Sequence, residues 1–480
     1  MVRPTFKYSV TRRTLLRGLL VSGGTLTFGP LLAACASGTA SSTASQPTAA
    51  PTAAAAAPTA STSSLKPQAT SAPASNGHYS LRLACNDSNY ELGLTKKVIA
   101  LFEKQNPSYQ VKVEPIPGDY ATKMIAEAAA NTLQDVMYTA DVFTLPFAVK
   151  GVIRDMMPFV KEDKSFNIDD IYSVMLKLGE TPQKPGGLFM LPQALDILVL
   201  FYNKTMFDKA SVGLPTAKWT IQDLVSAAKQ LTHATNDPKT TQYGINASWN
   251  WWAVYVPWMR GYGGDMMSAD GKTFIGDQPA AVAGIQAMAD LTTKDKVAPP
   301  PGMSFGGDPF ALGHVAMTHA TRDSIPQYRA TIAGKFDWDV QLWPAFPKKH
   351  VTGMGTQGFA FTTASKQPEQ AWTVTKFFVS KDGQKIFAST YSAVPSLKSM
   401  ANDPSWRSLP PPPSNNDVFI QSAAIGTLPP VLPLNCGSVY TGQVNQLMNN
   451  AFDKILRGTA AQQVLSDVGQ QINACVAQNG

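Results

Sequence analysis

The sequence predicts an α/β fold divided into two lobes, and two observations lead to this prediction. From Tyr79 onward, short apolar runs typical of strands alternate with amphipathic segments typical of helices. Residues 79–480 contain no tandem repeat and number about 400, which is too long for one compact core. Lobes of this kind place ligand sites beyond the carboxyl ends of their strands.

The first elements show this alternation. Residues 79–85 (YSLRLAC) have the composition of a strand, residues 94–107 form a helical pattern closed by Pro107, and residues 109–116 (YQVKVEPI) alternate between apolar and polar as a second strand does.

Three later segments are predicted to be helices. Residues 219–232 begin with a Thr-x-x-Asp cap at Thr220 and continue with an apolar stripe at helical spacing. The other two helices are expected over residues 371–380 and 444–458, the last ending at Gly458.

Residues 1–34 resemble an export signal and are set apart from the fold. Arg12 and Arg13 precede an uncharged, weakly apolar stretch over residues 18–34, a pattern that resembles a twin-arginine signal. The stretch is too short and too rich in glycine for a permanent membrane span. It ends in LLAAC, which resembles a bacterial lipobox with Cys35 as the lipid-modified first residue of the mature protein.

Residues 35–78 are predicted to form a disordered tether, because Ala, Ser, Thr and Pro dominate them and Lys66 is their single charge. A flexible chain of this length spans about 35 Å on average, so the folded part would lie just off a membrane.

The net charge excludes one class of function. Residues 1–34 carry five basic residues and no acidic one, so the formal charge of +7 falls to +2 when they are removed. No dense run of Lys or Arg occurs elsewhere, and this excludes a nucleic-acid-binding surface.

The cysteines and histidines indicate no metal centre. Cys436 and Cys475 can pair outside the cytoplasm, whereas Cys85 lies in an apolar strand and is expected to be a buried thiol. No C-x-x-C or H-E-x-x-H motif is present, and His314 and His319 have a weak metal spacing. We therefore expect no metal, no cofactor and no catalytic residue, although a glycosidase with carboxylates from distant segments stays open as the lesser alternative.

Five stretches, in this order, resemble the maltose-binding-like extracellular solute-binding proteins of ABC importers (family 1), which take up carbohydrates. They are residues 135–153, 186–232, 258–266, 310–323 and 358–380. The lipobox and the tether fit the same family independently, because a binding protein in a cell without a closed periplasm must be anchored.

The resemblance implies a periplasmic-binding-protein-like fold, in which crossing strands join two lobes around a ligand cleft. One lobe would take residues 79–194 plus 350–390, and the other residues 195–349 plus 391–480.

The resemblance also implies partners and a location. They are a small-molecule sugar ligand, the permease subunits of an ABC transporter and, through them, a cytoplasmic ATPase. The protein would be a monomer on the outer face of the cell membrane, held there through lipid at Cys35.

Residues 248–258 (SWNWWAVYVPW) hold four of the nine tryptophans, at a spacing that fits neither a helix nor a strand. A sugar needs aromatic platforms for its faces and carboxylates or amides for its hydroxyls. The family places sugar contacts in this stretch, before its Gly-Gly turn, and the alternative is lobe core, which we expect for Trp258. The predicted ligand contacts here are Trp249, Trp251, Trp252 and Tyr255.

Four acidic or amide residues are further candidates. Asp196 is the only charge in an apolar run, at a position where the family carries a sugar-binding acid; the alternative is an aspartate bonded to backbone. Asp141 lies between a predicted strand and helix, with Tyr138 and Thr139 as rivals. Asn86 and Asp87 follow the first strand, as ligand contacts or as a helix cap.

The run GMGTQG at residues 353–358 matches the dinucleotide fingerprint, but a strand follows it where a helix is required. It is interpreted as a glycine-rich crossing near the hinge, at which Gly355 and Thr356 approach the ligand, or as an ordinary loop.

The chain departs from the family at residues 318–323 (THATRD), where many members have a glycine and an aromatic residue. Arg322 is predicted to stack on a sugar or to grip an anion, or else to pair with Asp323. This keeps an anionic solute, such as a sugar acid or a glycerol phosphate ester, open beside a neutral oligosaccharide.

Overall fold

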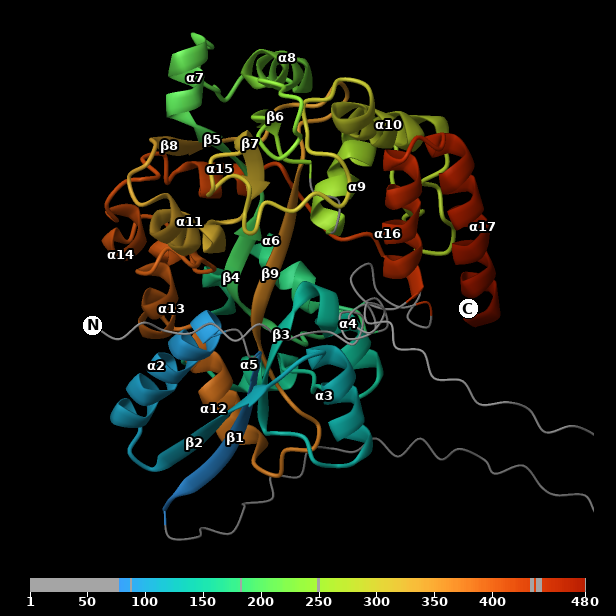
Figure 1. Cartoon of the computed structure of the whole chain (residues 1–480). Coiled ribbons are helices and arrows are strands. Elements are labelled where there is room, and N and C mark those ends of the chain that lie inside the picture. Colours follow the sequence, from blue (N-terminus) through green and yellow to red (C-terminus); the bar gives the residue numbers. More distant parts are fainter. Residues whose placement is uncertain are drawn as a thin grey trace, which may run out of the picture. The chain divides into compact units, whose positions relative to one another are not determined.

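The computed structural model describes residues 77–86, 89–181, 184–247, 251–431, 436 and 443–479. Two β-sheets, each covered by helices, form the two lobes, so the predicted fold class is confirmed (Figure 1). The twin-arginine motif, the lipidation site Cys35 and nearly all of the predicted tether lie outside the described residues. None of the described helices is both long and apolar enough to cross a bilayer.

The first sheet has seven strands, in the order β10-β4-β9-β3-β1-β2, with β11 paired to β9. Strand β1 is parallel to β2 and β3, so the loops after β1 and β3 leave the same edge of the sheet. Strand β9 is antiparallel to β3 and β4. The strands are β1 (Tyr79–Asn86), β2 (Tyr109–Ile116), β3 (Val136–Ala140), β4 (Leu191–Ile197), β9 (Thr352–Phe361), β10 (Val394–Pro395) and β11 (Gly426–Thr427).

One hydrophobic core packs on this sheet, with Leu83, Val136 and Phe361 fully buried in it. The helices that contribute to this core are α2 (Asn89–Gln105), α3 (Tyr120–Ala129), α4 (Asp141–Val149), α5 (Met157–Glu162), α12 (Pro368–Phe378) and α13 (Lys381–Ala388).

The second sheet has four strands in the order β6-β7-β5-β8, and β5 is antiparallel to both of its neighbours. The strands are β5 (Val199–Asn203), β6 (Tyr243–Ile245), β7 (Val315–Ala320) and β8 (Trp338–Gln341). Alternate residues of β5 enter two different cores: Leu200 packs in one and Phe201 in the other. The sheet is therefore covered on both faces.

The helices of these two cores come from distant parts of the chain. The larger core takes α7 (Lys204–Ala210), α8 (Ile221–Leu231), α9 (Trp252–Gly261), α10 (Pro279–Thr293), α16 (Gln443–Leu456) and α17 (Ala461–Asn479). The other takes α6 (Ser173–Leu176), α11 (Ile325–Ile332) and α15 (Val418–Ala423), and α14 (Pro404–Arg407) lies nearby in the chain.

The helix expected over residues 219–232 forms as α8, with the predicted cap. The side chain of Thr220 accepts a hydrogen bond from the Asp223 N–H at 3.3 Å, and the Asp223 carboxylate accepts one from the Thr220 N–H at 2.8 Å. This capping box satisfies donors that the first turn of a helix would otherwise leave without partners.

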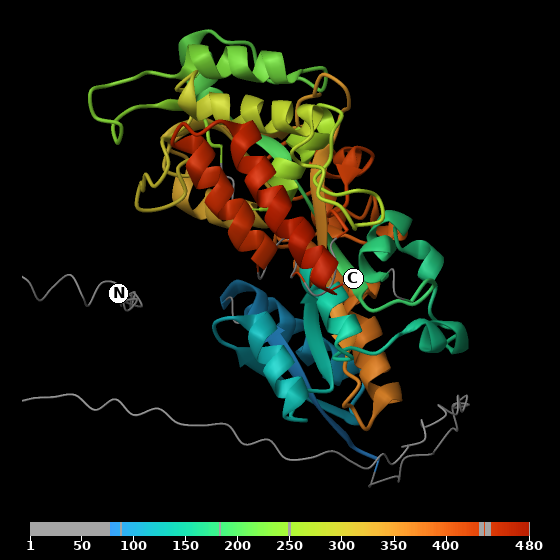
Figure 2. The same cartoon turned by 90° about the vertical axis from the view of Figure 1, so that its right-hand side faces the viewer.

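Helices α16 and α17 pack side by side at the surface of the second lobe (Figure 2). Cys436 and Cys475, whose pairing the sequence leaves open, are joined in a disulfide with their Cα atoms 5.7 Å apart. The bond ties the chain before α16 to the last turns of α17. Cys85 is a buried free thiol.

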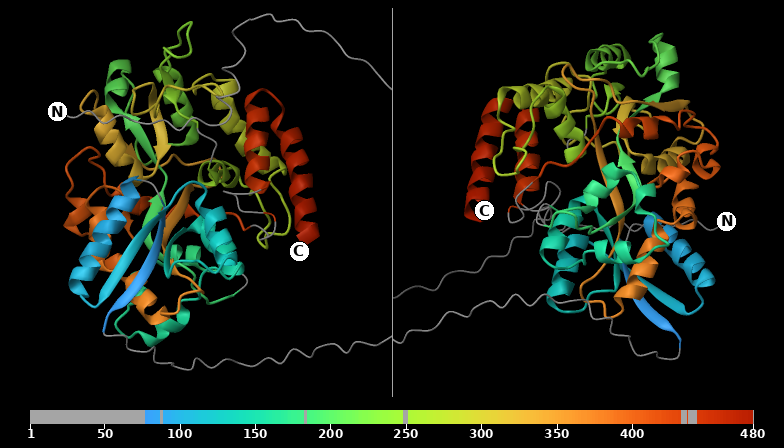
Figure 3. Two further views of the ribbon diagram at one scale, coloured as in Figure 1. Left: turned by 60° about the horizontal axis from the view of Figure 1, so that its bottom comes forward. Right: turned by 180° about the vertical axis from the view of Figure 1, so that it is seen from behind.

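The two sheets are joined at Leu198 and along β9. Only Leu198 separates β4 of the first sheet from β5 of the second, and its N–H donates to the carbonyl of Gly353 at 3.0 Å. Strand β9 runs from one lobe into the other (Figure 1, Figure 3), and all ten of its residues are buried. The glycine-rich run at 353–358 is thus neither a loop nor a nucleotide-binding turn but the interior of this strand.

We expect Gly353→Ala to destabilise the protein by at least about 2 kcal/mol, because overpacking a filled interior forces the backbone to move. A Cβ at this position would lie 1.9 Å from the carbonyl oxygen of Ala253 in α9. The matched control is Gly93→Ala in α2, where a Cβ meets nothing within 4 Å; alanine should stabilise that helix by about 0.5–1 kcal/mol. Urea unfolding of both variants measures the difference, and equal effects would contradict this packing.

Candidate ligand-binding site

Three residues from three elements meet where β4 and β9 run side by side. Asp196 in β4 is paired with Gly355 in β9. Asp141, the first residue of α4, lies on the same spot, since a Cβ built on Gly355 would be 3.1 Å from its Oδ1. Glycine at position 355 therefore makes room for a carboxylate against the strand.

Asp141 is held by backbone groups yet remains poorly solvated. The N–H groups of Thr356, Asp141 and Val142 hydrogen-bond its carboxylate and lower its pKa, as expected at a helix N-terminus. Burial has the larger effect and raises the pKa of Asp141 from 3.8 to about 7. Its Oδ2 is buried and has no hydrogen-bond partner among the described residues.

Asp196 is part of a cluster of like charges. Burial raises the pKa of Asp196 well above its ordinary value, and repulsion from Asp323, Asp141 and Glu91 raises it further. Asp196 keeps part of its surface accessible although protein surrounds it, as a group in a narrow cleft does. We call Glu91, Asp141, Asp196 and Asp323 the acidic cluster.

A pocket of about 510 Å³ opens beside this cluster. Glu91 in α2 and Gln357 in β9 line it from the first lobe, and Asp323 and Gln327 line it from the chain after β7 in the second lobe. Tyr138 in β3 donates a hydrogen bond from its hydroxyl to Oε1 of Gln357 at 3.3 Å, which fixes that amide. Leu94, Pro326, Phe387 and Ser392 complete the lining.

The pocket can hold a ligand that donates hydrogen bonds. Carboxylates and an amide oxygen accept hydrogen bonds from hydroxyl groups, and none of the described residues that line this pocket is Lys, Arg or His. Among the described residues, no group of His, Cys, Asp and Glu side chains has the arrangement of a metal site.

A family model described as bacterial extracellular solute-binding protein matches residues 88–385. The chain belongs to this family. A curated relative of this solute-binding protein is a binding protein of Brucella abortus (strain 2308), 23% identical over 79% of this chain and 89% of the relative. The sn-glycerol-3-phosphate-binding periplasmic protein UgpB of Pectobacterium atrosepticum is 24% identical over 53% of this chain and 58% of its own.

Solved structures share the fold of this solute-binding protein. The ABC substrate-binding protein Lmo0181 from Listeria monocytogenes, in complex with cycloalternan, has a TM-score of 0.73 at 24% identity and covers 83% of this chain and 99% of its own. UgpB from Mycobacterium tuberculosis, in complex with glycerophosphocholine, has a TM-score of 0.70 at 16% identity, with 83% and 99% covered. These neighbours establish two lobes of the periplasmic-binding-protein type.

The structure of the solute-binding protein places some, but not all, of the predicted site residues close together. Asp141 and Asp196 meet at Gly355, and the contact of these two carboxylates with a ligand stays a prediction; Gly355 itself is buried. Asn86 ends β1 and keeps part of its surface accessible, so its ligand contact stays a prediction. Asp87 and Trp249 lie outside the described residues.

Sequence reasoning missed Glu91 and Gln357 and gave Asp323 only the role of an ion-pair partner. Gln357 could have been predicted from the sequence, since it lies in the same glycine-rich run as Gly355. Asp323 could also have been predicted, because it follows a predicted strand. Glu91 lies in the first turn of a helix, where acidic residues are common for other reasons.

Arg322 does not reach the ligand, and that prediction is wrong. Its side chain is 1% exposed and its guanidinium lies among the rings of Tyr391, Trp406 and Phe419. The alternative of an ion pair with Asp323 does not occur in this structure either, because Asp323 faces the pocket.

Trp252, Tyr255 and Thr356 are also interior residues and not ligand contacts. Trp252 and Tyr255 are buried in the larger core of the second lobe, where helix α9 points them away from solvent. Thr356 is fully buried and its hydroxyl donates to the carbonyl of Ala194 at 2.5 Å. Trp251, just before α9, is partly exposed and packs edge-on against Trp252 at 6.2 Å between ring centres.

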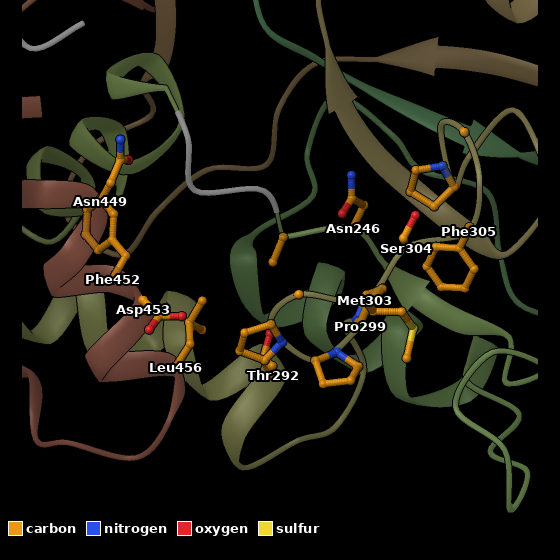
Figure 4. Close-up of a pocket in the computed structure, with 16 residues that line it drawn as sticks. Asn246, Thr292, Pro299, Met303, Ser304, Phe305, Asn449, Phe452, Asp453 and Leu456 are labelled. Atoms are coloured by element: carbon orange, nitrogen blue, oxygen red, sulfur yellow. The ribbon is translucent and has the colours of Figure 1, made fainter. Parts of the chain in front are cut away.

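A second pocket, of about 480 Å³, lies in the second lobe between α16 and the loop after α10 (Figure 4). The amides of Asn246 and Asn449, the hydroxyl of Ser304 and the rings of Phe305 and Phe452 line it. Rings and amides are the groups with which proteins hold sugars. Asn246 and Ala247 line this pocket and come just before the tryptophan-rich run in the sequence.

We expect the ligand-free protein to lose stability as pH rises from 5 to 8, relative to Asp141→Asn. The pKa of Asp141 is raised to about 7 by folding. Between pH 4 and 7 the unfolded chain releases this proton while the folded state keeps it, so the contribution of Asp141 to stability falls as pH rises. The advantage of the Asn variant should grow by about 2–3 kcal/mol between pH 5 and pH 8.

Urea unfolding at pH 5 and pH 8 measures this difference. Asp208→Asn, at an exposed position in α7, is the matched control and should show no such trend. An equal advantage of Asp141→Asn at both pH values would show that Asp141 does not carry a raised pKa.

Two adjacent tryptophans should respond differently to truncation. Trp252→Ala should cost about 3–5 kcal/mol of unfolding free energy, because it empties a filled interior. Trp251→Ala should cost less than half of that and should weaken ligand binding, because Trp251 is the partly exposed ring among the described aromatic residues of the predicted sugar-contact stretch. Urea unfolding and ligand titration measure the two effects, and a reversed order would place Trp251 in the core.

Proposed function

We propose that this solute-binding protein captures a neutral carbohydrate, most simply an oligosaccharide, outside the cell and delivers it to the permease of an ABC importer. The observation that carries the proposal is the acidic cluster beside a pocket whose described lining holds no cationic side chain. Sugar hydroxyls donate hydrogen bonds to such carboxylates. Trp251 remains a candidate platform for the face of a sugar ring.

The acidic cluster disfavours the anionic solutes that the sequence kept open. A phosphate or sugar acid would add negative charge beside four carboxylates, whereas phosphate sites normally supply Arg, Lys or backbone N–H groups. The likeness to the glycerol-3-phosphate-binding UgpB covers about half of this chain, and Arg322, the cation that supported such a ligand, is buried elsewhere. A neutral polyol or sugar fits the described groups better.

Capture would occur by closure of the two lobes. A ligand that contacts Gln357 from the first lobe and Asp323 from the second has more contacts in the closed state than in the open one, so it shifts the population toward closure. In this proposal a twin-arginine signal exports the chain, and lipid at Cys35 with the following tether holds it at the outer face of the membrane for delivery to the permease.

A ligand screen tests the proposal. The protein would be combined with neutral oligosaccharides, monosaccharides, polyols, sugar acids, sn-glycerol 3-phosphate and glycerophosphocholine, and followed by thermal shift and tryptophan fluorescence. Neutral sugars should raise the melting temperature by mass action and change the fluorescence. If only anionic compounds do so, the proposed substrate class is wrong.

Asp196→Asn should weaken binding of the active sugar at least tenfold, or about 1.4 kcal/mol, because hydroxyl donors of the sugar favour the ionised carboxylate with its two acceptor oxygens, and an amide has one. Calorimetric titration measures the affinity, with Asp208→Asn as the control that should bind as the wild type does. Unchanged affinity in Asp196→Asn would remove the acidic cluster from the ligand site.

A further inference from the structure

A buried cation lies directly behind the acidic pocket. The guanidinium carbon of Arg322 is 5.6 Å from the ring centre of Tyr391, 5.2 Å from that of Trp406 and 5.3 Å from that of Phe419. Its Nη1 donates to Oδ1 of Asn416 at 2.8 Å and its Nη2 to the carbonyl of Trp406 at 3.3 Å. We call these four partners of Arg322 the aromatic cage. Burial lowers the pKa of Arg322 to about 10, so it stays charged at neutral pH.

The cage joins three segments of the chain, two of which line the pocket. Arg322 and Asp323 begin the short 3-10 turn after β7, and Tyr391 and Ser392 follow α13. Trp406 lies in α14, Phe419 lies in α15 and Asn416 lies between these two helices. Helices α11, α13 and α14 lie on one side of the molecule (Figure 1). Asp323 and Ser392 line the pocket, and each is the chain neighbour of a caged side chain.

The two neighbours Arg322 and Asp323 point in different directions for a geometric reason. A 3-10 turn has three residues per turn, so successive side chains diverge by about 120°. Arg322 enters the cage while the carboxylate of Asp323 faces the pocket and accepts hydrogen bonds from the Thr321 hydroxyl and the Ser324 N–H. Anchoring the first side chain fixes the orientation of the second.

We propose that Arg322 is a positioning residue for ligand binding, which holds the Asp323 carboxylate at the pocket by anchoring the turn in the aromatic cage. This inference rests on the proposed function, since it assigns Asp323 to the carbohydrate site. Three ring faces and two fixed oxygen acceptors make the cage specific for a planar guanidinium, because an ammonium or a thioether cannot stack and bond in both ways.

The chain supplies a matched control. Arg329, in α11, stacks on the same Tyr391 ring at 4.8 Å and donates to the carbonyls of Pro410 and Pro412. It is an arginine of the same type on the same ring, but it does not adjoin a carboxylate of the pocket. A general loss of packing around Tyr391 would affect both arginines, whereas positioning of Asp323 concerns Arg322 alone.

The first test is a double-mutant cycle on the full chain, with the sugar that the screen identifies. Arg322→Met and Asp323→Asn should each weaken binding at least tenfold, and the double variant should bind within about twofold of Asp323→Asn, because one residue acts through the other. Arg329→Met should stay within about threefold of the wild type, since its contacts lie outside the pocket. Losses that multiply in the double variant, or wild-type affinity in Arg322→Met, would overturn the inference.

A second test needs no ligand. The side chain of Asp323 is exposed at the pocket, but the protein around it still raises the pKa of its carboxyl group. In Arg322→Met the released turn should let the carboxylate move away from the protein that surrounds it and into bulk water, so its pKa should fall toward the ordinary value. Loss of a nearby positive charge alone would raise that pKa. Carboxyl ¹³C NMR titration, assigned with Asp323→Asn, gives the direction. Arg329→Met should titrate as the wild type, and an unchanged pKa in Arg322→Met would overturn the inference.

The two tests separate failure of this inference from failure of the proposed function. If the wild type binds no carbohydrate, the function is wrong and the titration still decides the role of Arg322. If Arg322→Met does not fold, Arg322→Lys replaces it, because lysine keeps the positive charge but loses the planar guanidinium that stacks on the rings and donates from two nitrogens. The lysine variant should show the same direction of pKa change as methionine, and wild-type binding and titration in Arg322→Lys would contradict the inference.

Discussion

Close packing on both sides of β9 is the constraint on which the rest of the structure depends. The strand is buried along its whole length, and three glycines let other elements touch its backbone. A Cβ at Gly353 would meet α9, one at Gly358 would meet the backbone of β4, and one at Gly355 would meet Asp141. The same strand therefore joins the lobes, seats a helix of the second lobe and makes room for a carboxylate. A side chain at any of these positions would disturb the hinge and the site together.

The carboxylates at this junction are a cost to the folded protein that its own groups do not offset. Asp141 gains three backbone N–H contacts, yet burial still dominates its pKa, and Asp196 meets three further acids. A fold selected for stability alone would place apolar side chains here. Sites where burial and like charges raise the pKa values of several acids are frequently functional, because a ligand can supply the hydrogen-bond donors that the protein lacks.

The sequence predicted the chain elements and the acids of the site better than it predicted the aromatic contacts. Asp196 was identifiable because a charge in an apolar run needs a reason, and Asp141 because strand ends face the cleft. Trp252 was predicted as a ligand contact although it is a core residue. The irregular tryptophan spacing shows that neither the helical nor the strand pattern applies, but not which ring points inward. Arg322 was predicted to contact the ligand for a related reason. Its aromatic cage comes from residues 391–419, and no local sequence pattern indicates which distant rings will surround an arginine.

The positions of Arg322 and Asp323 also change what the departure from the family pattern means. A cation in the cleft would have indicated an anionic ligand, whereas a cation behind the cleft supports an acid within it. Neighbouring side chains in a 3-10 turn point in different directions, so only one of Arg322 and Asp323 can face the pocket. The sign of the charge that a ligand meets depends on which of the two does so. Three rings and two fixed acceptors hold Arg322 on the inner side, so the carboxylate of Asp323 lines the pocket in which we propose that the ligand binds. In the proposed site, packing on the far side of the turn therefore selects which charge the substrate meets.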